Sequence, residues 1–215
     1  MSKKKNKLKQ NNFKKYFWIM FFLFVTIIPI IFYFASLGFF GFMPDHTALE
    51  NPRTNLATEV ISSDGITLGK FYYEDNRTPV TYNELPIHLV NALIATEDRR
   101  FFDHAGIDAK GTLRAVFKLG RDGGASTISQ QLAKQLFHGE GAKNTFGRIV
   151  QKIKEWVIAI RLEKQYTKEE IIAQYFNIYD FGNYADGIRS ASRIYFGKEP
   201  LELNIPESAM LVGML

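Results

Sequence analysis

The 215-residue sequence contains no cysteine. This absence excludes a disulfide framework, a thiol nucleophile and any metal site with cysteine ligands. The sequence also lacks internal repeats, and it has no low-complexity stretch outside its first 15 residues. Because 46% of the residues are hydrophobic, the chain has enough apolar material for a sizeable core, and its length suggests one domain.

Acidic residues are absent from the first 15 positions, which hold seven lysines. The whole chain has a net charge of +5, so the remainder carries two more acidic than basic side chains. A basic tail can bind nucleic acid, but this one directly precedes an apolar run, which favours a position beside a membrane. We therefore predict a cytoplasmic basic tail at residues 1–15 and no nucleic-acid partner.

Charged residues are also absent from residues 16–43, where Phe, Ile and Leu dominate. About 20 apolar residues span a bilayer core, so this run is long enough for a transmembrane anchor. The alternative is a cleaved signal peptide, but its apolar stretch is usually only ~7–15 residues, and Ala35-Ser36-Leu37 is a poor cleavage site. The lysines on the N-terminal side predict a single pass with residues 44–215 on the outer face.

Residues 44–83 are predicted to form a linker that contains a short β-hairpin, with a connector at 44–58. Two β-prone runs, at residues 59–62 and 66–73, flank the turn signal Ser63-Asp64-Gly65. Beyond Pro86 the hydrophobic pattern is helical throughout. We therefore expect a mainly α fold, with a helical domain over residues 84–215.

The first helix of this domain is predicted to start near Pro86 and to end close to Glu97. Its apolar stripe comprises Ile87, Val90 and Ile94, and Glu97 falls next on the same face. Partial desolvation and the negative end of the helix dipole both disfavour the charge of this carboxylate. Such a group suits general acid–base catalysis. The alternative is a solvated glutamate paired with Arg99 or Arg100.

A second helix is predicted to begin around Ser126, with Thr127 as its N-cap. Gln130 follows three residues later, as in a capping box, and Lys134 lies on the face of Gln130. A helix N-terminus that follows glycines and carries hydroxyls and a nearby lysine can bind a phosphate. An ordinary capped helix with a solvated lysine is the alternative.

A third helix is predicted over residues 148–164. Its core stripe is expected to comprise Ile149, Ile153, Trp156, Val157 and Ile160. Arg148, Lys152 and Glu155 share another face, at spacings of four and three residues. These three side chains could hold a pyrophosphate, help to seat a divalent cation, or form ordinary surface ion pairs.

Three further helices are predicted before the end of the chain. A capping box at Thr167 and Glu170 opens the first, which ends near Asn177. The second covers residues 185–195, with Gly197 in a C-cap position. The third covers residues 205–215 and stops within its apolar pattern, so we expect the domain to be truncated there.

Five blocks of the sequence, in this order, resemble the glycosyltransferase domain of class A penicillin-binding proteins and monofunctional peptidoglycan glycosyltransferases, glycosyltransferase family 51. The blocks are residues 97–104, 124–131, 151–155, 171–182 and 187–198. The first four correspond to the family patterns Glu-Asp-x-x-Phe-x-x-His, Gly-Gly-Ser-Thr-Ile-x-Gln-Gln, Arg-Lys-x-x-Glu and Ile-Leu-x-x-Tyr-Leu-Asn. Ala125 stands in place of the second glycine of the second pattern. The resemblance covers residues 64–215. Gln151 stands where the family usually has arginine, and Arg148, one turn earlier, is a candidate substitute.

The resemblance implies a lysozyme-like α fold with a smaller membrane-proximal lobe, at the bacterial cytoplasmic membrane. It implies lipid II as the substrate and a lipid-linked glycan chain as the donor, with other cell-wall synthesis proteins as candidate partners. Glu97 would deprotonate the acceptor 4-hydroxyl, which would attack the anomeric carbon with inversion and expel undecaprenyl pyrophosphate. Glu155 would assist at the pyrophosphate, directly or through a divalent cation (Mg or Mn); no organic cofactor is implied.

Beyond the two catalytic glutamates, the resemblance implies a set of substrate-binding residues. They are Asp98, Phe102, His104, Ser126, Thr127, Gln130, Gln131, Lys134, Arg148 and Lys152. The three basic residues of this set would neutralise charge on the leaving group.

Two other functions remain as alternatives. A lysozyme-like domain can hydrolyse glycan, with Glu97 as general acid and water as nucleophile. The anchor and the basic residues near Glu155 favour a charged, lipid-linked donor instead. The second alternative is a membrane scaffold that keeps the fold without catalysis, to which Gln151 lends some support.

Overall fold

The computed structural model describes residues 2–45, 48–49, 58–65, 67–71, 77–117, 124–137, 142 and 144–215. These residues belong to two compact units, Met1–Met43 and Pro44–Leu215. Most of the predicted connector at residues 44–58 lies outside the described residues.

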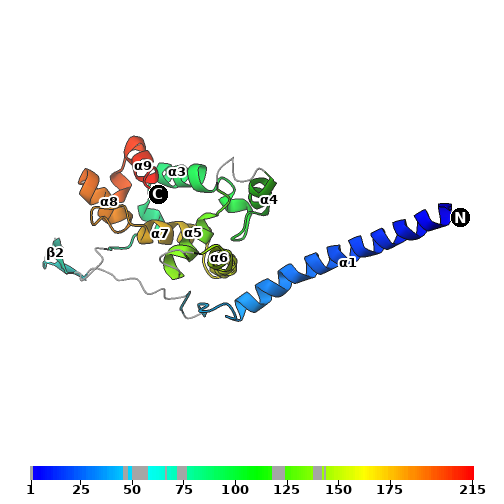
Figure 1. The fold of residues 1–215 in the computed structure, drawn as a ribbon. Coiled ribbons are helices and arrows are strands. Elements are labelled where there is room, and N and C mark those ends of the chain that lie inside the picture. The colour runs from blue at the N-terminus through cyan, green and yellow to red at the C-terminus, as the bar shows by residue number, and fades with distance from the viewer. Residues whose placement is uncertain are drawn as a thin grey trace. The chain divides into compact units, whose positions relative to one another are not determined.

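The first unit consists mainly of one long helix, α1 (Ser2–Ser36), shown in blue in Figure 1. Its segment Phe13–Ser36, 24 residues in length, is the one helix in the described part of the chain that is long and apolar enough to cross a membrane. The helix ends at Ser36, within the segment 16–43 that is predicted as the anchor. Gly38 and Gly41 then adopt φ angles of +80° and +106°, which a helix cannot contain and glycine tolerates.

The second unit contains a two-stranded antiparallel hairpin, as predicted. β1 (Thr58–Ile61) pairs with β2 (Thr67–Phe71), and Val60 lies opposite Gly69. The turn closes with a hydrogen bond from the Gly65 N–H to the Ser62 carbonyl at 2.9 Å, and Gly65 has a φ of +83°. The Ser63-Asp64-Gly65 turn signal therefore predicted the position of the hairpin correctly.

The rest of the second unit is helical, which confirms the predicted mainly α fold (Figure 1). Its α-helices are α3 (Ile87–Glu97), α4 (Ala109–Phe117), α5 (Ile128–Phe137), α6 (Thr145–Gln165), α7 (Lys168–Ile178), α8 (Gly187–Phe196) and α9 (Ile205–Val212). The described residues also form three short 3-10 helices: η1 (Tyr82–Glu84) before α3, η2 (Phe101–Asp103) between α3 and α4, and η3 (Pro200–Glu202) between α8 and α9. Helix α5 packs against α6 and α7, α3 packs against α9, and α7 also packs against α8.

The core of this unit forms where α5, α6 and α7 meet. Its fully buried apolar side chains include Ile128 and Leu132 of α5, Ile158 and Leu162 of α6, and Ile171, Ile172, Tyr175 and Phe176 of α7. Helix α5 packs against both α6 and α7, and this packing fixes the direction of its polar face. That face forms the floor of a polar cleft.

Helix α6 departs from the prediction in two respects. It begins at Thr145 rather than at Arg148, because the Asn144 side chain caps it by accepting a hydrogen bond from the Gly147 N–H at 2.6 Å. The predicted core stripe is also wrong in part: Ile149 is 55% exposed, whereas Ile158 is fully buried. Apolar residues occur on several faces of α6, and contact with α5 and α7 decides which of them is covered.

Alanine substitutions in α6 should distinguish the buried face from the exposed one. Ile158→Ala should lower the free energy of unfolding by about 2–5 kcal/mol, because the cavity that it leaves lies in the core. Ile149→Ala should change it by less than about 0.5 kcal/mol, as is usual at exposed positions. The measurement is chemical unfolding of the full chain in detergent, followed by near-ultraviolet circular dichroism. Similar losses in both variants would contradict the assigned face.

The later helices begin and end close to the predicted positions. Thr167 and Glu170 form the predicted capping box of α7, and Gly197 ends α8 with a φ of +65°. Helix α9 ends at Val212, before the end of the predicted segment 205–215, and Asn204 forms a capping box with Glu207 at its start.

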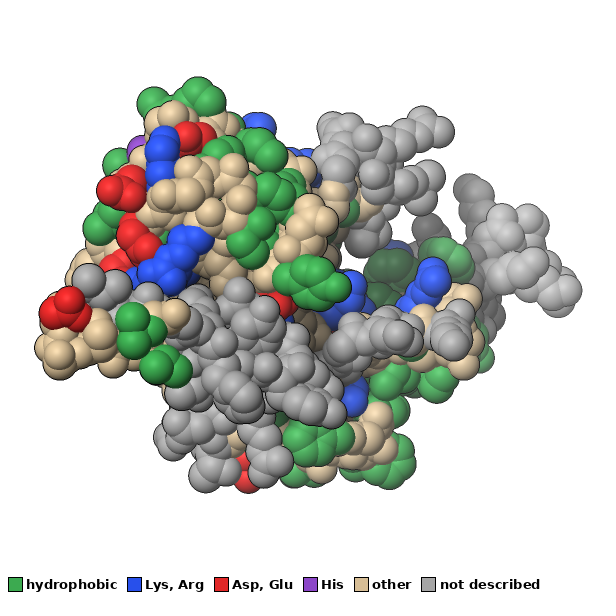
Figure 2. Space-filling model, turned by 90° about the vertical axis from the view of Figure 1, so that its left-hand side faces the viewer, with side chains coloured by type: hydrophobic (Ala, Val, Ile, Leu, Met, Phe, Trp, Pro, Cys, Tyr) green, Lys and Arg blue, Asp and Glu red, His purple; other side chains and the backbone are tan. Residues whose placement is uncertain are grey.

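Ion pairs join the segments around α8. Arg189 pairs with Glu84 of η1, and Arg193 and Lys198 bind Glu199 and Glu207, each at 2.6 Å. On the face drawn in Figure 2, acidic and basic side chains likewise lie close to one another. These pairs connect α8 to η1 before α3 and to the start of α9, and so hold the frame in which α3 presents its C-terminal end.

Candidate active site

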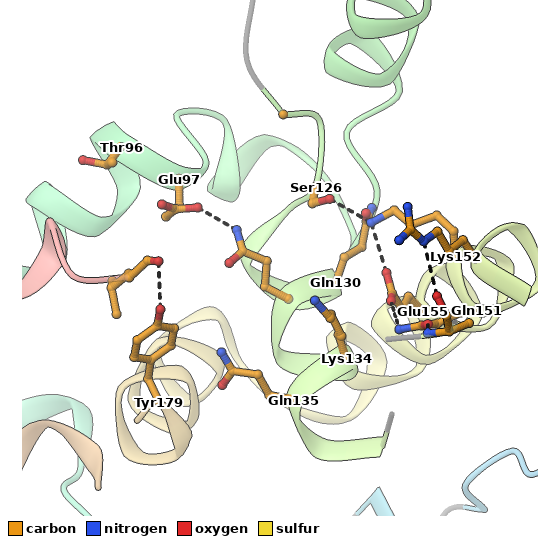
Figure 3. A pocket seen from close by; sticks show the side chains of 15 residues that line it. Thr96, Glu97, Ser126, Gln130, Lys134, Gln135, Gln151, Lys152, Glu155 and Tyr179 are labelled. Carbon is orange, nitrogen blue, oxygen red and sulfur yellow. Dashed lines mark hydrogen bonds and ion pairs between the residues drawn. The ribbon is translucent and has the colours of Figure 1, made fainter. Parts of the chain in front are cut away.

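A cleft of about 1020 Å³ opens between the C-terminal end of α3, the polar face of α5 and the N-terminal half of α6. Its lining is strongly polar. It comprises Thr96, Glu97, Gly124, Ser126, Gln130, Gln131, Lys134, Gln135, Ala142, Arg148, Gln151, Lys152, Glu155, Tyr179 and Leu215. Figure 3 shows Glu97 at one end of the cleft and Glu155 with Lys152 at the other, with α5 side chains between them.

A second, smaller hollow of about 290 Å³ adjoins the cleft. Both hollows are lined by Thr96, Glu97, Gly124 and Ser126. Its wall holds three arginines, Arg99, Arg100 and Arg114, together with the carboxylates of Glu97, Asp98 and Asp108. Glu97 therefore lies at the boundary of two polar hollows, and each hollow has basic side chains.

Glu97 is the last residue of α3, as predicted. Its Oε2 accepts a hydrogen bond of 2.7 Å from the Gln131 side-chain amide of α5. The two arginines considered as alternative partners bind elsewhere: Arg99 donates to the Ala95 carbonyl at 3.1 Å, and Arg100 pairs with Asp108. A carboxylate with one amide partner, at the wall of a cleft, has a free oxygen that can accept a proton from a bound hydroxyl.

The opposite end of the cleft is built on α6 around Glu155, which is only 5% exposed. Lys152 lies 3.1 Å from Glu155 Oε2 and donates to the Ser126 hydroxyl at 2.8 Å. The structure therefore joins the second and third sequence blocks through one ammonium group. Lys134 lines the same cleft, as its spacing from Gln130 predicts.

Gln151, which replaces the usual arginine, has a defined position in this cluster. Its amide donates to Glu155 Oε1 at 3.1 Å, and its carbonyl oxygen accepts the Ala142 N–H at 2.8 Å. Arg148 donates to the Ala142 carbonyl at 3.2 Å. Like an arginine, Gln151 therefore donates a hydrogen bond to Glu155, but it adds no positive charge. Arg148, one turn earlier on α6, carries a positive charge.

Thr127 and Gln130 support the start of α5 from within the protein. Thr127 accepts the Gln130 N–H at 3.2 Å, as an N-cap residue does. The reciprocal half of the predicted capping box is wrong, because Gln130 Oε1, which would accept the Thr127 N–H, is buried without a hydrogen-bond partner. The amide nitrogen of Gln130 donates to the Gly106 carbonyl at 3.2 Å. The Thr127 hydroxyl donates to the same carbonyl at 2.8 Å. Their role in substrate binding stays a prediction.

Asp98 and His104 form a buried pair behind the cleft. His104 Nε2 lies 3.0 Å from Asp98 Oδ2, and the same oxygen accepts the Ile128 N–H at 3.2 Å. Asp98 thereby anchors the N-terminus of α5 to the end of α3. It lines the smaller hollow, whereas Phe102 is 55% exposed and, like His104, lines neither hollow. Substrate contacts by these residues stay predictions.

The surroundings of Glu155 do not fit a divalent cation in the arrangement observed. Both carboxylate oxygens have donors, from Gln151 and from the ammonium group of Lys152, which would repel a metal ion. Among the residues that the structure describes, no group of three or more His, Asp or Glu side chains is placed to hold a metal.

Tyr175 and Tyr179 were not predicted as site residues. The Tyr175 hydroxyl donates to Gln131 Oε1 at 3.0 Å, and Tyr179 lines the cleft. Burial, followed by the charge of Glu97, raises the pKa of both phenols. The two tyrosines are four residues apart, at the last turn and the C-cap of α7, so they lie on one face of this helix. This spacing could have indicated in the sequence that both face the same site.

Comparison with known proteins covers most of the chain. Residues 64–215 match the family model described as Transglycosylase. The chain is 36% identical over 207 residues to penicillin-binding protein 1F of Bacillus subtilis strain 168, which covers 94% of this chain and 28% of the relative. It is 38% identical over 176 residues to penicillin-binding protein 1A of Escherichia coli K12, and this match covers 80% of this chain and 20% of the relative. The chain thus spans less than a third of the length of these relatives.

Proposed function

Because this chain belongs to the transglycosylase family, which provides the peptidoglycan glycosyltransferase domain of class A penicillin-binding proteins, we propose that it polymerises lipid II into β-1,4-linked glycan strands. The helical body is consistent with the lysozyme-like domain expected for this family. The smaller membrane-proximal lobe remains a prediction.

The position of Glu97 between the two polar hollows is the observation that carries this proposal. A glycosyl transfer between two lipid-linked sugars needs two neighbouring sites for anionic pyrophosphate groups. It also needs one base where the acceptor hydroxyl meets the donor sugar. The cations of the large cleft suit the leaving pyrophosphate, and the arginines of the small hollow suit the acceptor.

In the proposed reaction, Glu97 takes the proton of the acceptor 4-hydroxyl as that oxygen attacks the donor anomeric carbon. The bond from this carbon to the pyrophosphate oxygen breaks, and undecaprenyl pyrophosphate leaves on the opposite face, which inverts the centre. Lys152, Lys134 and Arg148 stabilise the negative charge that develops on the leaving oxygen. Glu155 holds Lys152 in place beside Ser126.

The test is polymerisation of purified lipid II by the full chain in detergent or vesicles. We expect glycan strands that lysozyme digests, together with release of undecaprenyl pyrophosphate. New reducing ends from purified sacculi, without polymerisation of lipid II, would instead support the hydrolase alternative. Neither product from a folded chain would support the scaffold.

We also propose that α1 anchors the chain in the bacterial cytoplasmic membrane, with the lysine tail in the cytoplasm. The apolar segment Phe13–Ser36 and the seven lysines before and at its start support this orientation. It would place the cleft on the same side as the carbohydrate portion of lipid II that is to be polymerised.

Labelling of single cysteines should reveal the orientation without background, because the chain has no native cysteine. Ser63→Cys, in the exposed hairpin turn, should react with an impermeant maleimide in spheroplasts. Ser2→Cys should react only after lysis. The reverse pattern would contradict the proposed topology, and loss of the Ser2→Cys label with a shortened chain would indicate a cleaved signal peptide.

A further inference from the structure

A chain of two hydrogen bonds connects the buried core to Glu97. The Tyr175 hydroxyl of α7 donates to Gln131 Oε1 of α5 at 3.0 Å. The amide nitrogen of Gln131 then donates to Glu97 Oε2 at 2.7 Å. The three residues come from three helices and are separated by 34 and 44 positions along the sequence.

The orientation of the Gln131 amide follows from its two partners. Tyr175 is fully buried, and burial raises the pKa of its phenol, so the hydroxyl is protonated at neutral pH and acts as a donor. An ionised carboxylate can only accept hydrogen bonds, so the amide nitrogen of Gln131 points to Glu97. The carbonyl oxygen then faces the core, where the Tyr175 hydroxyl donates to it and holds the amide in this orientation.

We infer that Tyr175 is a positioning residue for Glu97 and acts through the Gln131 amide. The inference rests on the proposed function of Glu97 as the base. With the amide held by the core, one oxygen of Glu97 is bound and the other is left for the acceptor hydroxyl. Without the Tyr175 hydroxyl, the carbonyl oxygen of the amide loses its partner in the core, and the amide and the carboxylate that it binds are held less firmly.

Several other titratable or charged groups lie near Glu97. From α5, Lys134 lines the same cleft, and after α7, Tyr179 is a second phenol with a raised pKa. Neighbouring charged residues have partners of their own: Asp98 with His104, Arg99 with the Ala95 carbonyl, and Arg100 with Asp108. On α9, which packs against α3, Glu207 pairs with Lys198. Gln131 is the group that donates directly to the Glu97 carboxylate.

The test is the pH dependence of lipid II polymerisation by the Tyr175→Phe variant of the full chain. We expect kcat to fall on the order of tenfold, because the base is less well oriented, with KM changed less than about twofold. The donor to the carboxylate is held less firmly in this variant and stabilises its charge less well. The acidic limb of the pH–rate profile should therefore move to higher pH.

A double-mutant cycle separates positioning from a structural effect. Gln131→Leu should shift the acidic limb in the same direction, and adding Tyr175→Phe to it should shift the limb no further. Tyr166→Phe is the matched control: it removes the hydroxyl that donates to the Leu49 carbonyl at 2.5 Å, in contact with neither Gln131 nor Glu97. This control should leave the pH profile unchanged.

An unchanged acidic limb in Tyr175→Phe, or shifts that add in the double variant, would overturn the inference even if the wild-type chain polymerises lipid II. A wild-type chain without polymerase activity would instead overturn the proposed function. The two failures are therefore distinguishable.

Discussion

Glu97→Gln should reduce lipid II polymerisation by about 10²–10⁴-fold, which is the usual contribution of a positioned general base. Glutamine has nearly the same shape, and its carbonyl oxygen can still accept the hydrogen bond from Gln131. It cannot take a proton from the acceptor hydroxyl. The measurement is the initial rate of glycan formation, with near-ultraviolet circular dichroism to verify that the variant is folded.

Glu169→Gln is the matched control for this substitution. Glu169 is an exposed glutamate in the first turn of α7 and lies outside both hollows. The Glu169→Gln variant should polymerise lipid II at the wild-type rate. A wild-type rate in Glu97→Gln would remove Glu97 as the base, and Glu155, the other glutamate of the cleft, would then have to accept the proton.

Lys152→Met should reduce the rate by about 10²–10³-fold, as is typical when one preorganised donor to a developing charge is removed. Lys152 joins Ser126 to Glu155, and its side chain is 40% exposed toward the cleft, so its ammonium group can contact a bound phosphate. Methionine preserves the length of the side chain. The rate should fall mainly through kcat, because the charge on the leaving oxygen develops in the transition state.

Lys164→Met provides the control on the same helix. Lys164 is an exposed lysine in the last turn of α6, and it lines neither hollow. It should leave the polymerisation rate unchanged. If Lys152→Met lost activity only in proportion to unfolded protein, the lysine would be a structural partner of Glu155 rather than a group that stabilises the leaving pyrophosphate.

Helix caps and tight turns can be predicted from the sequence because their physical cause is local. The caps at Thr167 and Gly197 and the turn at Gly65 depend on residues within a few positions, and all three are confirmed. The buried face of α6 was predicted less well, because Ile149 and Ile158 are equally apolar. Which of them is buried depends on contacts with α5 and α7, and periodicity carries no information about those contacts.

The predicted hydrogen bond from the Thr127 N–H to the Gln130 side chain is absent for a related reason. Thr127 and Gln130 have the spacing that favours a local pair. The carbonyl of Gly106, a residue 21 and 24 positions away, accepts from both side chains instead. The residues around Thr127 in the sequence cannot predict such a distant acceptor. In the structure, the two side chains connect the start of α5 to the loop after η2.

The sequence by itself determined that the chain has one apolar helix of membrane-spanning length, a mainly helical domain and a glutamate at the end of its first helix. These features follow from composition, period and caps, which act over a few turns of chain. Only the tertiary structure decided that Gln131 and Tyr175 orient Glu97, and that Lys152 lies between Ser126 and Glu155. Such contacts form when helices distant in sequence bury their apolar faces together, and the polar side chains then meet wherever that packing places them.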